Sequence, residues 1–71
     1  MNQHLIDMLM KSAEADKAKA LLSLDLLGNS AVGIGDHSTD DFYNNAEEAL
    51  SKLVDADDRI SALNRYFIKE K

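Results

Sequence analysis

The residues best suited to chemistry lie in the middle of the chain. Asp36, His37 and Ser38 are the residue types of a hydrolytic triad. A triad needs its nucleophile, base and acid to come from separate backbone positions, so that they line up through hydrogen bonds. Three consecutive residues do not meet that geometry. We therefore expect no catalytic residues and a protein that is not an enzyme.

The same region holds four possible metal ligands, Asp36, His37, Asp40 and Asp41. Carboxylates and an imidazole that converge where a loop enters a helix could bind a divalent cation. The structural interpretation is that Asp40 and Asp41 cap the helix, Asp36 makes a turn and His37 is solvated. A calcium loop also needs regularly alternating oxygen ligands, which this segment lacks. We favour no metal and no cofactor, and keep a metal-binding or catalytic loop as the alternative.

The glycines in this region form an incomplete phosphate-binding motif. Gly28 and Gly33 have the spacing of a P-loop, but Ile34 and Gly35 occupy the positions that require lysine and serine or threonine. No strand is expected before the motif, so nucleotide binding is not predicted.

The elements around this region are two helices. The chain has no proline, and its three glycines lie within eight residues of one another. This distribution predicts a helix over about 3–27, a loop over 28–38 and a helix over about 39–68, in a single domain. Gly28 is predicted to end the first helix as a left-handed cap.

Both predicted helices carry an apolar stripe. In the second helix the spacing alternates between three and four residues, through Phe42, Ala46, Ala49, Leu53, Ala56, Ile60, Leu63 and Phe67. The stripe of the first helix is interrupted by Asp16 and consists of Ile6, Leu9, Ala13, Ala20, Leu24 and Leu27. Such stripes pack against each other. The fold class is therefore all-α, a two-helix antiparallel hairpin in which alanines permit close approach.

The first helix has a second apolar stripe, which predicts self-association. Placed at 100° per residue, its members lie well round the helix from the first stripe. Together with two residues of the second helix, the predicted self-association residues are Met8, Ala15, Leu22, Leu26, Leu50 and Val54. Two hairpins joined through these residues would make a four-helix bundle, so the expected partner is a second copy in a homodimer.

Composition limits the other partners. The 71 residues have a formal net charge of −5, with no run of lysine and arginine to neutralise phosphates, so we expect no direct binding to nucleic acid. The chain lacks a long apolar run and a signal-peptide pattern, which predicts no membrane association and a cytoplasmic location. Without cysteine, association is the simplest way to complete so small a core.

Three runs of sequence, 33–39, 41–45 and 55–59, resemble small uncharacterised helical proteins of T4-like phages of marine cyanobacteria. The resemblance covers about the C-terminal half. It implies a phage accessory protein in a bacterial cytoplasm and brings no site residues with it. The resulting hypothesis is a non-enzymatic helical protein that self-associates and binds a protein partner. A further alternative is an acidic inhibitor of a nucleic-acid-binding host protein.

Overall fold

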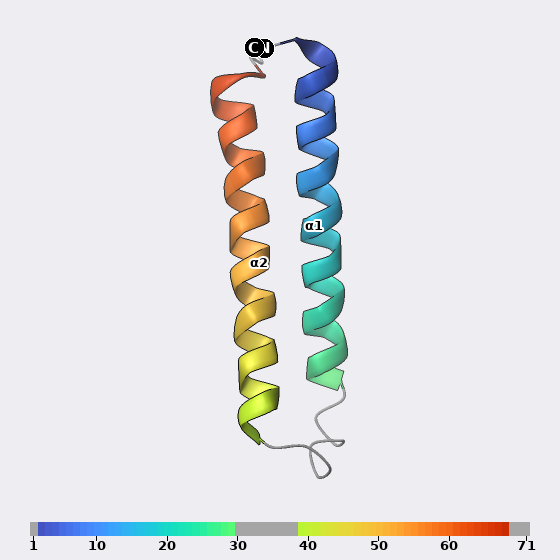
Figure 1. Cartoon of the computed structure of the whole chain (residues 1–71), viewed down its shortest axis with the longest axis vertical. Coiled ribbons are helices and arrows are strands. Elements are labelled where there is room, and N and C mark those ends of the chain that lie inside the picture. The colour runs from blue at the N-terminus through green and yellow to red at the C-terminus, as the bar shows by residue number, and fades with distance from the viewer. Residues whose placement is uncertain (1, 30–38, 69–71) are drawn as a thin grey trace.

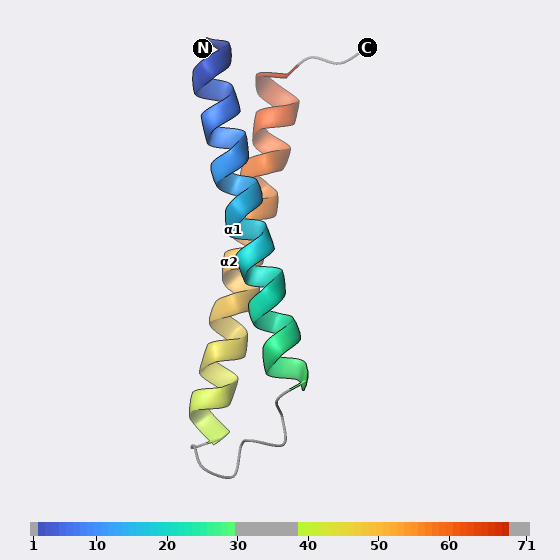
Figure 2. The ribbon, with the colours of Figure 1, turned by 90° about the vertical axis from the view of Figure 1, so that its right-hand side faces the viewer.

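The computed structural model describes residues 2–29 and 39–68, which form two helices packed against each other. Helix α1 spans Gln3–Asn29 and helix α2 spans Thr39–Tyr66. The helices run antiparallel, with the start of α1 and the end of α2 at the same end of the hairpin (Figure 1). Their axes are inclined to each other, as the turned view shows (Figure 2). The predicted all-α antiparallel hairpin is confirmed.

Local hydrogen bonds define the start of α1. The Leu5 backbone N–H donates to the side-chain Oδ1 of Asn2 at 2.8 Å, and the Ile6 N–H donates to the Asn2 carbonyl at 3.1 Å. Asn2 therefore acts as the N-cap, satisfying a donor that an isolated helix end leaves without a partner.

Helix α2 ends slightly earlier than its sequence predicts. The N–H groups of Phe67 and Ile68 both donate to the carbonyl of Leu63, each at 3.0 Å, and Tyr66 is the last helical residue. Phe67 thus lies past the end of the regular helix. Its side chain, predicted to belong to the core stripe, is 47% exposed.

The prediction that Gly28 caps α1 is wrong. The helix continues through Gly28 to Asn29, and none of the described glycines has a positive φ. A Cβ built on Gly28 meets no atom of the described residues within 4 Å. Within residues 2–29 and 39–68, therefore, no backbone conformation or packing contact requires glycine at this position.

This finding gives a prediction whose sign is informative. Gly28→Ala is expected to raise the free energy of unfolding by about 0.5–1 kcal/mol, because alanine loses less backbone entropy in a helix. The corresponding rise in Tm is about 2–8 °C for a domain of this size. Thermal melting followed by circular dichroism measures it. A lower Tm would mean that residue 28 adopts the left-handed conformation in solution.

The interior of the hairpin is a narrow row of side chains at seven-residue intervals. The buried hydrophobic residues are Ile6, Ala13 and Ala20 on α1 and Ala49, Ala56 and Leu63 on α2. Four of the six are alanines, so the helices approach closely and bury little area per residue. A buried alanine methyl contributes about 0.8 kcal/mol at the usual value per carbon, against about 1.5–3 kcal/mol for a buried leucine or isoleucine.

Candidate interaction surface

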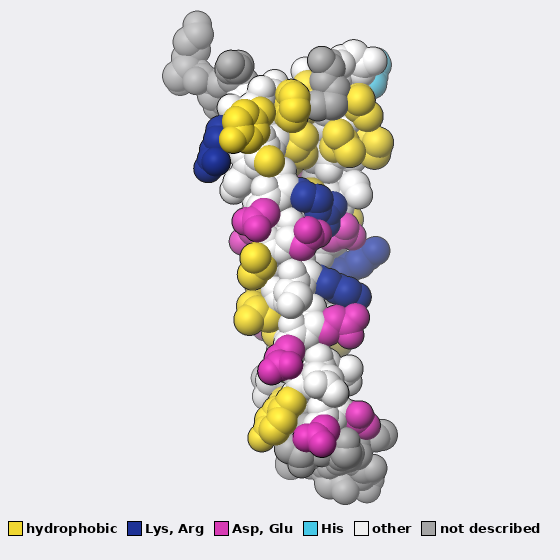
Figure 3. Space-filling model, turned by 60° about the vertical axis from the view of Figure 1, so that its left-hand side comes forward, with side chains coloured by type: hydrophobic (Ala, Val, Ile, Leu, Met, Phe, Trp, Pro, Cys, Tyr) yellow, Lys and Arg dark blue, Asp and Glu magenta, His cyan; other side chains and the backbone are white. Residues whose placement is uncertain are grey.

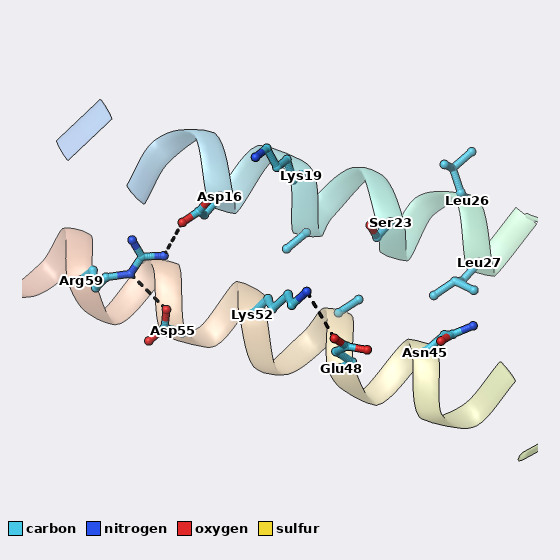
Figure 4. Close-up of a pocket in the computed structure, with 12 residues that line it drawn as sticks. Asp16, Lys19, Ser23, Leu26, Leu27, Asn45, Glu48, Lys52, Asp55 and Arg59 are labelled. Carbon is cyan, nitrogen blue, oxygen red and sulfur yellow. Dashed lines mark hydrogen bonds and ion pairs between the residues drawn. The ribbon is translucent and has the colours of Figure 1, made fainter. Parts of the chain in front are cut away.

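Asp16, which interrupts the apolar stripe of the first helix, forms a hydrogen-bonded ion pair with the other helix. Arg59 of α2 donates from Nη2 to Oδ2 of Asp16 on α1 at 2.8 Å, and from Nε to Oδ2 of Asp55 at 3.0 Å. Figure 4 shows the guanidinium between these two carboxylates. The hydrogen bond from Arg59 holds the pKa of Asp16 below its ordinary value, 3.8. The same bond raises the pKa of Arg59.

The shifted pKa of Asp16 predicts a pH-dependent contribution to stability. A lowered folded-state pKa means that the contribution is present above pH 3.8 and is lost as the pH falls below that value, through the folded pKa. Asp16→Asn is therefore expected to lower Tm at neutral pH, with the difference from wild type shrinking in acid. Thermal melts across this pH range test it. Asp25→Asn, an exposed change on the same helix, is the control, and an Asp16→Asn difference that stays constant with pH would contradict the prediction.

Arg59 and Asp16 border a groove along one side of the hairpin. The charged side chains that line it are Asp16, Lys19, Glu48, Lys52, Asp55 and Arg59. Lys52 and Glu48 form an ion pair at 3.3 Å, also drawn in Figure 4. Three cations and three anions leave the groove without net charge. This balance gives the groove no electrostatic preference for an anionic or a cationic ligand. We name this side the charged side.

The opposite side of the hairpin can be identified from helix geometry. Successive residues are 100° apart, so the residues before and after a buried residue lie on opposite flanks of its helix. Lys19 precedes buried Ala20 and lines the charged groove, whereas Leu21 follows Ala20. In α2, Glu48 and Leu50 flank buried Ala49 in the same way. Leu21 and Leu50 therefore belong to the side away from the charged groove.

We name this second side the leucine face. It consists of four leucines, two from each helix: Leu21, Leu24, Leu50 and Leu53. Leu24 and Leu53 are half-buried at the edge of the interior row, while Leu21 and Leu50 are 45% and 52% exposed. Further along this side, Lys17 of α1 pairs with Asp57 of α2, with 3.1 Å between Nζ and Oδ1. The leucine face is thus an apolar surface that spans both helices.

Large hydrophobic residues are exposed over most of the hairpin. The exposed members are Leu5, Met8, Leu21, Leu22, Leu26, Tyr43, Leu50, Val54, Tyr66 and Phe67. Figure 3 shows hydrophobic side chains gathered at the end of the hairpin where the chain begins and ends, with charged side chains along its middle. Among the described residues, ten large hydrophobic side chains are thus exposed, whereas four of the six buried positions are alanines. An ordinary globular core buries its large apolar residues.

The predicted self-association residues are all exposed, but the hairpin does not bring them together. Met8, Ala15 and Leu22 each follow a buried residue of α1 by two positions, which places them on the outer surface of that helix, away from α2. Val54 precedes buried Ala56 by two positions and faces outward on α2, in the opposite direction.

The remaining two predicted residues, Leu26 and Leu50, lie on opposite sides of the hairpin. Leu26 lines the charged groove, and Leu50 belongs to the leucine face. Leu21 was not predicted from the sequence as an interaction residue. Its position directly after Ala20, a member of the first stripe, is the signal that places it beside the interior row.

The candidate metal ligands are only partly described. Asp36 and His37 lie outside the described residues. Asp40 and Asp41 lie exposed in the first turn of α2, where negative charge is favourable at a helix N-terminus. Within residues 2–29 and 39–68, no three histidine, cysteine, aspartate or glutamate side chains come together as a possible metal site.

Neither described helix is long and apolar enough to cross a membrane. Comparison of the chain with protein-family models, with curated proteins and with solved structures gave no match. Its function is therefore inferred from its own surface.

Proposed function

We propose that this chain is a non-enzymatic interaction protein that self-associates and binds a protein partner. The observation that supports the proposal is the number of large apolar side chains exposed beside an interior lined largely by alanine. Among the described residues, alanines occupy four of the six buried positions, while ten large hydrophobic side chains are exposed. Apolar side chains that gather on one exposed surface, as the leucines of the leucine face do, mark association surfaces.

Energetics favour the same proposal. A chain of 71 residues buries only about 60% of its unfolded surface and is marginally stable alone. The chain has no cysteine to form a disulfide, and over residues 2–29 and 39–68 the large buried side chains are Ile6 and Leu63 alone. Association would cover leucines that the hairpin leaves exposed. Each leucine that becomes fully buried would contribute about 1.5–3 kcal/mol of favourable free energy.

Light scattering on the purified chain tests self-association. We expect a dimer at micromolar concentration and a Tm that rises with protein concentration, because a partner that binds only the folded state stabilises it. A fully helical monomer that melts cooperatively, with a Tm independent of concentration, would overturn the proposal.

The proposed protein partner and bacterial cytoplasmic setting rest on the phage resemblance. The net charge of −5 makes direct binding to nucleic acid or to an anionic membrane unfavourable. Affinity capture from a bacterial lysate, with a Met8→Lys/Leu22→Lys variant as the matched control, tests for a partner. Recovery of the same proteins by both chains would argue against specific binding through the outer surface of α1.

A further inference from the structure

We infer that the leucine face, Leu21, Leu24, Leu50 and Leu53, is the surface on which a second copy of this chain docks. The two copies are related by a two-fold axis parallel to the helices, so that both α1 helices begin at the same end of a four-helix bundle. This inference rests on the proposed self-association and goes beyond it by naming the face and the orientation.

The shape of a four-helix bundle selects between the two sides of the hairpin. Two hairpins that pack face to face must each present a surface that spans both of their helices. The outer surface of α1, with Met8 and Leu22, is formed by one helix alone and does not extend onto α2. Of the surfaces that span both helices, the charged side has six ionised groups along its groove. The four leucines of the leucine face lie on the side of the Lys17–Asp57 ion pair that leads toward Asn29 and Thr39.

The ion pair on this side favours one orientation of the two copies. Lys17 and Asp57 lie close to the middle of their helices, with 43% and 53% of their side chains exposed. A two-fold axis parallel to the helices places α1 opposite the partner's α2 at the same level. Lys17 then meets the partner's Asp57, and the two pairs form an alternating group of four charges. An axis perpendicular to the helices at the level of this pair would instead bring Lys17 near the partner's Lys17, which is repulsive.

The parallel axis also brings the two leucine faces into contact. All four leucines lie on the same side of the Lys17–Asp57 pair, so same-end packing places them against their counterparts in the second copy. With a perpendicular axis at the level of the ion pair, they would face the part of the partner on the other side of that pair. The isologous contact is therefore self-complementary in both apolar residues and charge.

The available area suits a stable dimer. A helix the length of α1 is about 40 Å long, and two adjacent helices are about 20 Å across. Face-to-face packing thus covers about 800 Å² of each copy, which is about the area that each partner contributes to a standard interface.

Adjacent leucines of α1 provide a matched test of the face. Leu21 belongs to the leucine face and Leu22 to the outer surface of α1, with 45% and 59% of each exposed. Leu21→Glu is expected to raise the dimer dissociation constant at least about 100-fold, because both copies of a symmetric dimer carry the substitution and each loses its leucine contact. Leu50→Glu should do the same from α2. Leu22→Glu should remain dimeric in light scattering, with helicity checked by circular dichroism.

A distance measurement tests the orientation without altering the face. The chain has no cysteine, so His4→Cys, exposed near the start of α1, carries a single spin label. Same-end packing predicts a label-to-label distance below about 30 Å, and opposite-end packing about 40 Å or more, the length of the helix. The longer distance would overturn the proposed orientation. This result does not depend on whether the glutamate variants remain folded.

The outcomes separate the inference from the proposed function. A monomeric wild-type chain would reject self-association itself. A dimer that survives Leu21→Glu and Leu50→Glu but dissociates with Leu22→Glu would leave self-association standing and reject the leucine face.

Discussion

Leu63→Ala is expected to lower the free energy of unfolding by about 2–5 kcal/mol, the usual cost of truncating a buried leucine. Leu63 is 7% exposed and is the one large side chain of the buried row on α2. The interior is otherwise mostly alanine, so little surrounding side chain can move in to fill the space. The expected fall in Tm is at least about 8 °C for a domain of this size.

Urea titration and thermal melting measure this effect. Leu22→Ala is the matched control, because it removes the same atoms from the outer surface of α1 and is expected to change stability by less than about 0.5 kcal/mol. Equal effects of the two substitutions would show that the interior row does not stabilise the hairpin.

Ala56→Leu is expected to lower the free energy of unfolding by about 1–3 kcal/mol, for the opposite steric reason. Ala56 is completely buried where α2 faces α1. A larger side chain there must push the helices apart or adopt a strained conformation. Separation would also lengthen the neighbouring contact between Arg59 and Asp16, which are 2.8 Å apart.

Ala18→Leu, an exposed change on α1, is the control for added volume. We expect Ala18→Leu to melt close to wild type and Ala56→Leu to melt at a lower temperature. If Ala56→Leu were neutral or stabilising, the close approach of the helices could not depend on the alanine row.

Alanine thus has two roles in this hairpin. At the buried positions it lets α1 and α2 approach closely, and in doing so it leaves the leucines beside the row without full cover. Leu21 and Leu24 follow Ala20 on α1, and Leu50 and Leu53 follow Ala49 on α2. A narrow seam between the helices and an exposed apolar face beside it are therefore linked features of one sequence pattern.

The Arg59 contacts show where a local pattern reaches its limit. The spacing of Asp55 and Arg59 suits a pair one helical turn apart, and the structure has this pair at 3.0 Å. Asp16, however, looked only like an interruption of the first-helix stripe. Its role as a contact between the helices depends on the level at which α1 and α2 meet, which no spacing within α1 contains.

The sequence by itself determined that there are two helices, that they form an antiparallel hairpin and that alanines line its interior. These features follow from the period of the apolar residues and from the absence of proline, which act over one or two helical turns. Only the tertiary structure decided that Gly28 is helical, that Asp16 meets Arg59, and that Leu21 and Leu50 share one side while Leu22 and Val54 face apart. The physical reason is that the rotation and level of each helix are set by packing against the other, through contacts about forty residues apart in the chain, as between Asp16 and Arg59.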